Sequence, residues 1–398
     1  MATTSTTTST TTSRKRTTVR LVVALMAFGV LSSSCAAVVR TSVDTAGGDP
    51  DSESQDVALS EDGRFAAFAS FAGDLVPNDN NGVKDIFVRD HQTGVTELIS
   101  LSMNGGSANG TSGQPDITPD GRFVVFWSFG DDLVPGDTNG GSDVFVFDRD
   151  TDTMELVSVA TDGSQGLGAL GGSISDNGQR VAFYEYGSLD PNDTNSSHDV
   201  YVRDRVLATT KLMSTVEGGT AAAGLSYDPV ISGVGTEIAF HTSSDDVIAL
   251  DTNGFSDVVW RTVVLNIRQL VSINTSGGSG NLHSYNPSIS RLGDIVAFES
   301  SASDLVVGDI AGFGDVFRRD VFGLSTERVS QRPSGGGFVE GNGNSFLPSI
   351  SADGTMIAYG SSANNLADPA DTPADTNGFS DVYIWDAGEN TLGSQTMQ

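Results

Sequence analysis

Short apolar segments alternate with polar, glycine-rich connections from about residue 38 to the end of the chain. The clearest segments are rich in Val, Ile, Phe and Ala, as expected of strands buried on both faces. They cover residues 65–70, 123–128, 181–186, 238–243, 295–300 and 356–361. No helical apolar period occurs after residue 38. The pattern therefore predicts an all-β chain.

An acidic loop follows each of these segments and leads into another apolar strand. The most regular copies have the sequence Asp-x-Asn-Gly-x-x-Asp, and the loops begin at Asp79, Asp137, Asp193, Asp251, Asp309 and Asp375. Successive loops begin 58, 56, 58, 58 and 66 residues apart, which indicates a tandem repeat. An insertion at residues 368–374 accounts for the longer last spacing.

Two further strands complete each repeat. The first strand ends in an apolar–hydroxyl pair such as Ile117-Thr118, and an Asp-Gly or Asn-Gly turn typical of tight hairpins follows it. The fourth strand, for example residues 96–100, follows a polar turn. Six repeats of four antiparallel strands predict a six-bladed β-propeller over residues 36–398. A solenoid is the alternative, but it needs polar capping repeats, and the end repeats here resemble the middle ones.

The ring of blades needs a strand that closes it. Residues 38–43 resemble the fourth strand of a repeat, and we expect them to pair into the sixth blade. Closure by both ends of the chain removes exposed strand edges. The tail at residues 391–398 is the alternative closing strand.

The repeat also resembles a known family. Its pattern Ile-Ser-x-Asp-Gly-Arg-x-Val-Ala-Phe-x-Ser, followed by Asp-Thr-Asn-Gly-x-x-Asp-Val-Phe-Val-Arg-Asp, is similar to the TolB-like, WD-like propeller repeat of exported bacterial proteins. The resemblance covers roughly residues 38–398 and implies a propeller. It does not imply one activity, because propellers carry many.

The N-terminus has the features of a secretory signal peptide at residues 1–35. A basic cluster that includes Arg14 and Arg20 precedes an apolar run at residues 21–31, which is too short to span a bilayer, and small residues follow. Cys35 at this exit predicts lipidation and a lipid anchor, and ordinary cleavage near Ala36 or Ala37 is the alternative. We expect an exported protein that is secreted, periplasmic or at the cell surface, with no transmembrane segment in the mature chain.

The charge of the chain limits its partners. The formal net charge is -30, and removal of four basic residues with the signal makes it about -34. Such a chain repels nucleic acid and anionic membrane surfaces. We therefore expect cations or basic groups on a protein or cell-envelope partner, and a monomer.

The acidic loops are candidate calcium sites. Asp and Asn supply the hard oxygen ligands that calcium prefers, and a glycine permits the sharp turn. The predicted ligands are Asp79, Asn81, Asp85, Asp137, Asn139, Asp143, Asp193, Asn195, Asp199, Asp251, Asn253, Asp257, Asp375, Asn377 and Asp381. The fifth repeat is left out because Ala311 replaces its asparagine. The alternative is that these residues only hold turns, since Asp and Asn bond their own backbone two residues on.

Two functions follow from this pattern. The first is a non-catalytic binding or scaffold propeller that uses its acidic-loop face and is stabilised by calcium. The second is an enzyme of the lactonase or sugar-dehydrogenase type with a site in the central channel. An enzyme needs acid–base groups from several blades at one channel mouth, where the repeats depart from their consensus. The loops and turns keep their consensus around the ring, and the histidines are scattered along the sequence, so the sequence favours binding. His283, Tyr285 and Asn286 are candidates to line the channel mouth, and a solvated loop is the alternative for them.

Overall fold

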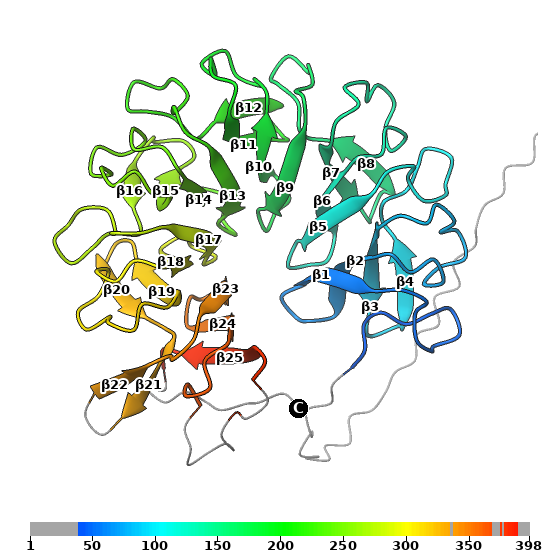
Figure 1. The fold of residues 1–398 in the computed structure, drawn as a ribbon. Coiled ribbons are helices and arrows are strands. Elements are labelled where there is room, and N and C mark those ends of the chain that lie inside the picture. Colours follow the sequence, from blue (N-terminus) through cyan, green and yellow to red (C-terminus); the bar gives the residue numbers. More distant parts are fainter. Residues whose placement is uncertain (1–38, 335–336, 368–374, 376–377, 389–398) are drawn as a thin grey trace, which may run out of the picture. The chain divides into compact units, whose positions relative to one another are not determined.

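The structure is a computed structural model that describes residues 39–334, 337–367, 375 and 378–388. All regular secondary structure in these residues is β-strand, so no helix there is available to cross a membrane. The strands belong to the compact unit Thr41–Gln398 and form six successive antiparallel blades and one separate two-stranded hairpin (Figure 1). The prediction of an all-β, six-bladed propeller is confirmed. The signal peptide at residues 1–35, with Cys35, lies outside the described residues.

Each blade is a meander in which strands that are adjacent in sequence pair side by side. The innermost strands of blades 1–6 are β1 (Ser54–Leu59), β5 (Ser112–Ile117), β9 (Ala169–Ile174), β13 (Ser226–Ile231), β17 (Ser284–Ile289) and β23 (Ser345–Ile350). The second strands are β2 (Phe65–Ser70), β6 (Phe123–Ser128), β10 (Arg180–Tyr186), β14 (Glu237–Thr242), β18 (Ile295–Ser300) and β24 (Met356–Ser361). The third strands are β3 (Asp85–Asp90), β7 (Asp143–Asp148), β11 (His198–Asp204), β15 (Asp257–Thr262), β19 (Asp315–Asp320) and β25 (Asp381–Asp386). The outer strands of blades 1–5 are β4 (Val95–Leu98), β8 (Thr153–Leu156), β12 (Thr209–Leu212), β16 (Arg268–Leu270) and β20 (Ser325–Arg328).

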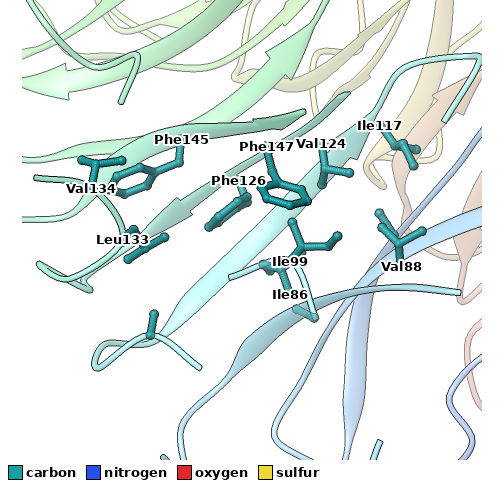
Figure 2. Packing of buried hydrophobic residues seen from close by; sticks show 13 residues of the cluster. Ile86, Val88, Ile99, Ile117, Val124, Phe126, Leu133, Val134, Phe145 and Phe147 are labelled. Carbon is teal, nitrogen blue, oxygen red and sulfur yellow. The ribbon is translucent and has the colours of Figure 1, made fainter. Parts of the chain in front are cut away.

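The hydrophobic core lies between the blades. Val88 of blade 1 and Ile117 and Phe126 of blade 2 belong to one buried cluster (Figure 2). Within blade 2, the rings of Phe126 and Phe145 stack with centroids 6.0 Å apart. Because apolar side chains of two blades fill each interface, a blade is stable only against its neighbours, as in other repeat folds.

The turn between the first two strands packs on the preceding blade. Gly121 of blade 2 has φ +73° and lies against the ring of Phe65 in blade 1. Arg149 donates to the Gly121 carbonyl at 2.5 Å, and its guanidinium lies 4.5 Å from the centroid of the Phe65 ring. Blades 2 and 3 repeat this arrangement with Phe123, Gly178 and Arg205.

Blade 5 carries an additional hairpin, formed by β21 (Gln331–Ser334) and β22 (Gly337–Glu340). Blades 1–4 have a single β-bridge after the outer strand instead. The innermost strands of blades 5 and 6 consequently begin 61 residues apart, against 58 for blades 1 and 2. The longer last spacing is therefore not due to residues 368–374 alone, and those residues lie outside the described part of the chain.

The described residues do not show which strand closes the ring. Residues 39–43 form no β-ladder, and the sixth sheet contains the three strands β23, β24 and β25. Residues 391–398 are outside the described residues. Closure by residues 38–43 stays a prediction.

Candidate functional site

The acidic loops connect the second strand to the third in each blade, and most of their aspartates in blades 1–5 are buried. The last aspartates of loops 1–4 begin the third strands and have no exposed surface: Asp85, Asp143, Asp199 and Asp257. The first aspartates of loops 1, 3 and 4 are 3–6% exposed: Asp79, Asp193 and Asp251. These carboxylates therefore lie beneath the acidic-loop face instead of projecting from it.

Each buried last aspartate accepts a hydrogen bond from a serine just after the outer strand. In blade 4, Ser272 Oγ donates to Asp257 Oδ1 at 2.5 Å and accepts the Val258 N–H at 3.0 Å. The same pair recurs as Asp85–Ser100, Asp143–Ser158, Asp199–Ser214 and Asp315–Ser330. Desolvation raises the pKa of Asp257 to about 7, because the serine bond offsets only part of the effect of burial.

The loop asparagine holds the turn. Asn253 Oδ1 accepts the Phe255 N–H at 2.6 Å, and Nδ2 donates to Asp257 Oδ2 at 2.7 Å and to the Gly280 carbonyl at 2.6 Å. Its amide is thus engaged within the blade, as in an Asx turn. Asn81 makes the equivalent three bonds, and Asn139 and Asn195 keep the turn bond. Asn377 lies outside the described residues.

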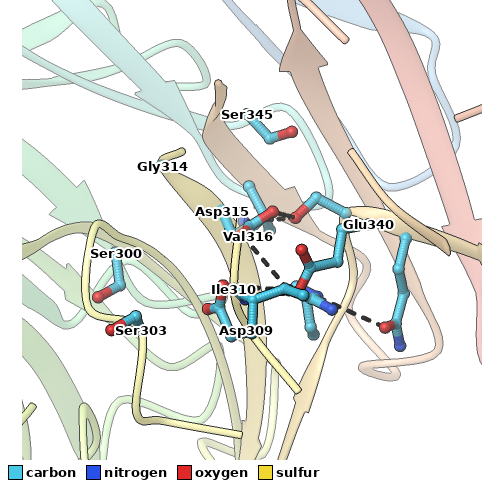
Figure 3. Close-up of polar contacts among 12 residues, drawn as sticks. Ser300, Ser303, Asp309, Ile310, Gly314, Asp315, Val316, Glu340 and Ser345 are labelled. Carbon is cyan, nitrogen blue, oxygen red and sulfur yellow. Dashed lines mark hydrogen bonds and ion pairs between the residues drawn. The ribbon is translucent and has the colours of Figure 1, made fainter. Parts of the chain in front are cut away.

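Blade 5 places an arginine beside its acidic loop. Arg328 Nη1 lies 2.6 Å from Glu340 Oε1, 3.2 Å from Asp309 Oδ1 and 3.7 Å from Asp315 Oδ2 (Figure 3). Arg328 is 6% exposed, so this ion-pair network is buried. The equivalent residues of blades 1–4 are Leu98, Leu156, Leu212 and Leu270. Sequence reasoning missed this exchange, although alignment of the fourth strands contains it.

The loops supply few metal ligands each. Among the described residues, no three His, Cys, Asp or Glu side chains gather closely enough to hold a metal ion. One loop offers calcium two carboxylates, and main-chain and water oxygens have to complete the usual six to eight ligands. In blade 6, Asp375 and Asp381 are described and Asn377 is not. Calcium in these loops stays a prediction.

A β-bulge in each innermost strand lines the central channel. Its third residue has a positive φ, which non-glycine residues adopt rarely and mostly where the surroundings enforce it. These residues are Asp56, Gln114, Gly171, Asp228, Asn286 and Leu347, with φ between 48° and 75°. Those of blades 2–6 line a channel cavity of about 460 Å³. The channel thus presents strained, mostly polar residues.

The residues around the bulge differ from blade to blade. The second residues of the innermost strands are Gln55, Gly113, Leu170, Tyr227, Tyr285 and Phe346. Their partners on the second strands are Ala69, Trp127, Tyr184, His241, Glu299 and Gly360. The sequence argument that the repeats keep their consensus is therefore wrong for the innermost strands, whose third residues line the channel cavity in blades 2–6 and also differ between blades. It compared the acidic loops and the Asp-Gly turns, not the second residues of the innermost strands and their partners.

A continuous row of rings crosses blades 3–5 at this level. His198 lies with its ring centroid 5.1 Å from those of both Tyr186 and Tyr227. The Tyr227 ring is 5.7 Å from His241, which is 5.5 Å from Tyr285. His283 stacks on Tyr285 with centroids 5.5 Å apart. His198, His241 and His283 thus come from three blades to one row, which their positions in the sequence did not indicate. We call residues 184, 186, 198, 227, 241, 283 and 285 the ring row.

Carboxylates accompany the ring row. Asp228 Oδ2 lies 3.5 Å from His241 Nδ1, and the Asp228 side chain is 44% exposed. Glu299 Oε2 accepts a bond from Asn286 Nδ2 at 2.9 Å. Burial lowers the pKa of His198 and His241, so both rings are neutral at pH 7. The ring row therefore combines neutral rings with nearby carboxylates, of which Asp228 lines the channel cavity.

In blades 1 and 2, a lysine of the chain itself lies over aromatic rings. Lys84 Nζ lies 5.6 Å from the Trp127 ring centroid, 6.0 Å from that of Phe71 and 3.5 Å from Asp56 Oδ2. An ammonium over aromatic faces beside a carboxylate is a cation–π arrangement. Among the described residues, no lysine or arginine lies over a tyrosine of the ring row.

No protein-family model and no curated protein sequence matches this chain. Solved structures share its fold. The β-propeller domain of the Trilobed protease from Pyrococcus furiosus has a TM-score of 0.52 and 11% identity, covering 84% of this chain and 81% of that one. Oligogalacturonate lyase in complex with manganese has a TM-score of 0.50 and 12% identity, covering 88% and 81%. TolB from Acinetobacter baumannii has a TM-score of 0.42 and 17% identity, covering 71% of this chain and 57% of that one, so this chain spans little more than half of that TolB.

The comparison agrees with the β-propeller fold that the strand topology shows. At these identities the likeness shows the fold alone. Function has to be argued from the site.

Proposed function

We propose that this chain is a non-catalytic, exported binding propeller that holds a positively charged segment of a protein or cell-envelope partner at its channel mouth. The observation that supports this function is the ring row with Asp228 and Glu299. The repeats differ from one another around the bulge in all six blades, whereas the acidic loops of blades 1, 2, 4 and 6 keep the full Asp-x-Asn-Gly-x-x-Asp pattern. Variation between repeats on a concave surface is typical of a ligand site.

The chemistry of the ring row favours a basic group. Tyrosine faces attract ammonium and guanidinium groups, and a nearby carboxylate adds a direct ion pair. The neutral imidazoles of His198 and His241 do not repel a cation. Lys84 is a precedent within the same chain, because it lies over aromatic rings beside Asp56. The net charge of -30 also draws basic segments toward this protein and away from nucleic acid.

Binding of short peptides tests this function. A Lys/Arg hexapeptide, a Gly/Ser hexapeptide and an Asp/Glu hexapeptide are titrated into the protein by calorimetry at constant ionic strength. We expect only the basic peptide to bind. Tyr227→Ala should weaken it about 2- to 30-fold, the range expected for one cation–π contact, and Glu299→Gln should weaken it too.

Glu61→Gln is the matched control, because Glu61 is an exposed acid at the turn on the opposite face. If Glu61→Gln weakens binding as much as Glu299→Gln, attraction is a general effect of surface charge and the proposed site is wrong. Absence of binding by the basic peptide also refutes it.

A second candidate function is the channel enzyme, because the His241–Asp228 pair could move a proton at the channel mouth. Turnover of a lactone or sugar substrate that is lost in His241→Gln but kept in Tyr227→Ala would favour it over binding.

Export is part of the proposal and rests on residues 1–35. Expression in a bacterial host should give a mature chain that begins near residue 35, as measured by mass spectrometry. If Cys35 is acylated, Cys35→Ser should release the protein from the membrane fraction. A mature chain that keeps residues 1–35 contradicts export.

A further inference from the structure

In each of blades 1–4, at least one oxygen of a buried acidic-loop carboxylate has no hydrogen-bond donor. The oxygens without a hydrogen-bond partner are Asp79 Oδ2, Asp143 Oδ2, Asp199 Oδ2 and both carboxylate oxygens of Asp251. Asp251 is 3% exposed. A buried charge without a partner is costly, so native structures pair such groups or use them to bind metal.

Blade 5 differs in this respect. Asp309 and Asp315 are 8% and 1% exposed, and neither is among the residues with a buried side-chain oxygen that lacks a hydrogen-bond partner. The reason is Arg328, whose guanidinium lies within 3.7 Å of both carboxylates (Figure 3). The other four blades have leucine at that position. Among the described residues of blades 1–5, blade 5 alone has no acidic-loop oxygen in this unpartnered set, and it alone has an arginine beside the loop.

We propose that the acidic loops of blades 1–4 bind calcium between their first and last aspartates, where blade 5 places the Arg328 guanidinium. Blade 4 is the strongest of these sites. The first aspartates of blades 2 and 3 have donors within the chain, from Gln165 to Asp137 and from Tyr201 to Asp193, whereas Asp251 has none. Calcium suits these loops because its ligands are hard oxygens and its coordination is flexible.

Two carboxylates per site imply weak binding, in the millimolar range known for extracellular modules. That range fits a protein outside the cell. This inference does not depend on the ring row, since the loops and the channel lining are different surfaces of the blade.

Thermal unfolding of the metal-depleted protein is the test, with CaCl2 from zero to about 10 mM, at ionic strength kept constant with KCl. A ligand that binds only the folded state raises the midpoint as it saturates. We expect Tm to rise with calcium and not with KCl. Asp251→Asn should reduce this rise and should raise Tm without calcium, because it removes a buried charge.

Asp309→Asn is the matched control. It changes the same loop position in blade 5, where Arg328 occupies the cation position, and the calcium-dependent rise should stay at its original size. Arg328→Leu, which gives blade 5 the residue of the other blades, should enlarge the rise, because Asp309, Asp315 and Glu340 then lose their guanidinium.

No rise in Tm at 10 mM calcium overturns the proposal, and so does an equal loss of the rise in Asp251→Asn and Asp309→Asn. A variant that does not fold is replaced by Asp79→Asn, which removes the equivalent aspartate of blade 1. Basic-peptide binding by calorimetry is measured on the same samples. If calcium does not raise Tm but the basic peptide still binds, the calcium inference is wrong and the proposed binding function stands.

Discussion

Packing of the turn glycines on the preceding blade leads to a sharp prediction. Gly63 and Gly121 occupy the same turn in blades 1 and 2, with φ +67° and +73°. A methyl group on Gly121 would lie 2.8 Å from Cγ and Cε2 of Phe65, whereas no described atom lies within 4 Å of one on Gly63. Gly63→Ala and Gly121→Ala therefore share the backbone effect and differ in the contact between blades.

The magnitudes follow from these two effects. A left-handed conformation costs alanine about 1–2 kcal/mol, and this applies to both variants. Overpacking adds about 1–3 kcal/mol for Gly121→Ala. The Phe65 ring has little room to move, because the guanidinium groups of Arg64 and Arg149 lie 4.6 Å and 4.5 Å from its centroid. We expect Gly121→Ala to lose about 1–3 kcal/mol more than Gly63→Ala.

Urea unfolding followed by circular dichroism measures the difference. Equal m-values for the two variants show that the same surface unfolds, so the difference in midpoint reports stability. Losses that agree within about 0.5 kcal/mol would mean that this turn does not hold blades 1 and 2 together, and the account of the interface would be refuted.

Three further predictions concern burial. Without calcium, Tm should fall as pH rises from 5 to 8, because burial raises the pKa of Asp85 and Asp257 to about 7. The stability that these two carboxyl groups contribute is complete below their unfolded pKa and is lost as they ionise in the folded protein. A Tm that rises over this window would contradict the prediction. Ser272→Ala should cost about 1–3 kcal/mol in urea unfolding, because it leaves the Asp257 carboxylate without its donor, whereas exposed Ser276→Ala should change stability by less than about 0.5 kcal/mol. Phe126→Ala should cost about 3–5 kcal/mol by the same assay if the interface of blades 1 and 2 is the core, and a loss below 1 kcal/mol would contradict that.

The fold was predictable because two independent signals agree. Buried strands of Val, Ile, Phe and Ala recur at a fixed spacing, and Asp-Gly turns such as Asp120-Gly121 separate the strands. Each signal depends on local sequence alone. The hairpin β21–β22 was missed because its residues depart from the repeat, and the other repeats contain no equivalent hairpin from which to infer it.

The role of the loop residues was harder to predict. An aspartate in a polar loop looks exposed, and its burial follows from contacts that local sequence does not contain. The Ser272–Asp257 pair is an exception, since a serine stands 15 residues after the last aspartate in each of blades 1–5. That spacing was present in the sequence and was not used.

The channel site needed the structure. Tyr227, His241 and Tyr285 are far apart in sequence, and only the register of the innermost strands brings their rings together. The clue was the difference between repeats at one aligned position. An alignment that looks only for residues shared by all repeats overlooks such a position.

Blade 4 separates the two proposals within one unit of the fold. It contributes Tyr227 and His241 to the channel while its acidic loop keeps the regular Asp-x-Asn-Gly-x-x-Asp pattern. Blade 5 contributes Tyr285 and also has an irregular loop. The residues that a blade contributes to the ring row therefore do not depend on whether its acidic loop keeps the repeat pattern. Asp251→Asn should reduce the calcium-dependent rise in Tm and leave the affinity for the basic peptide unchanged. Tyr227→Ala should weaken peptide binding and leave the calcium-dependent rise in Tm unchanged. If either variant changes both quantities, calcium binding and peptide binding are coupled through the blade.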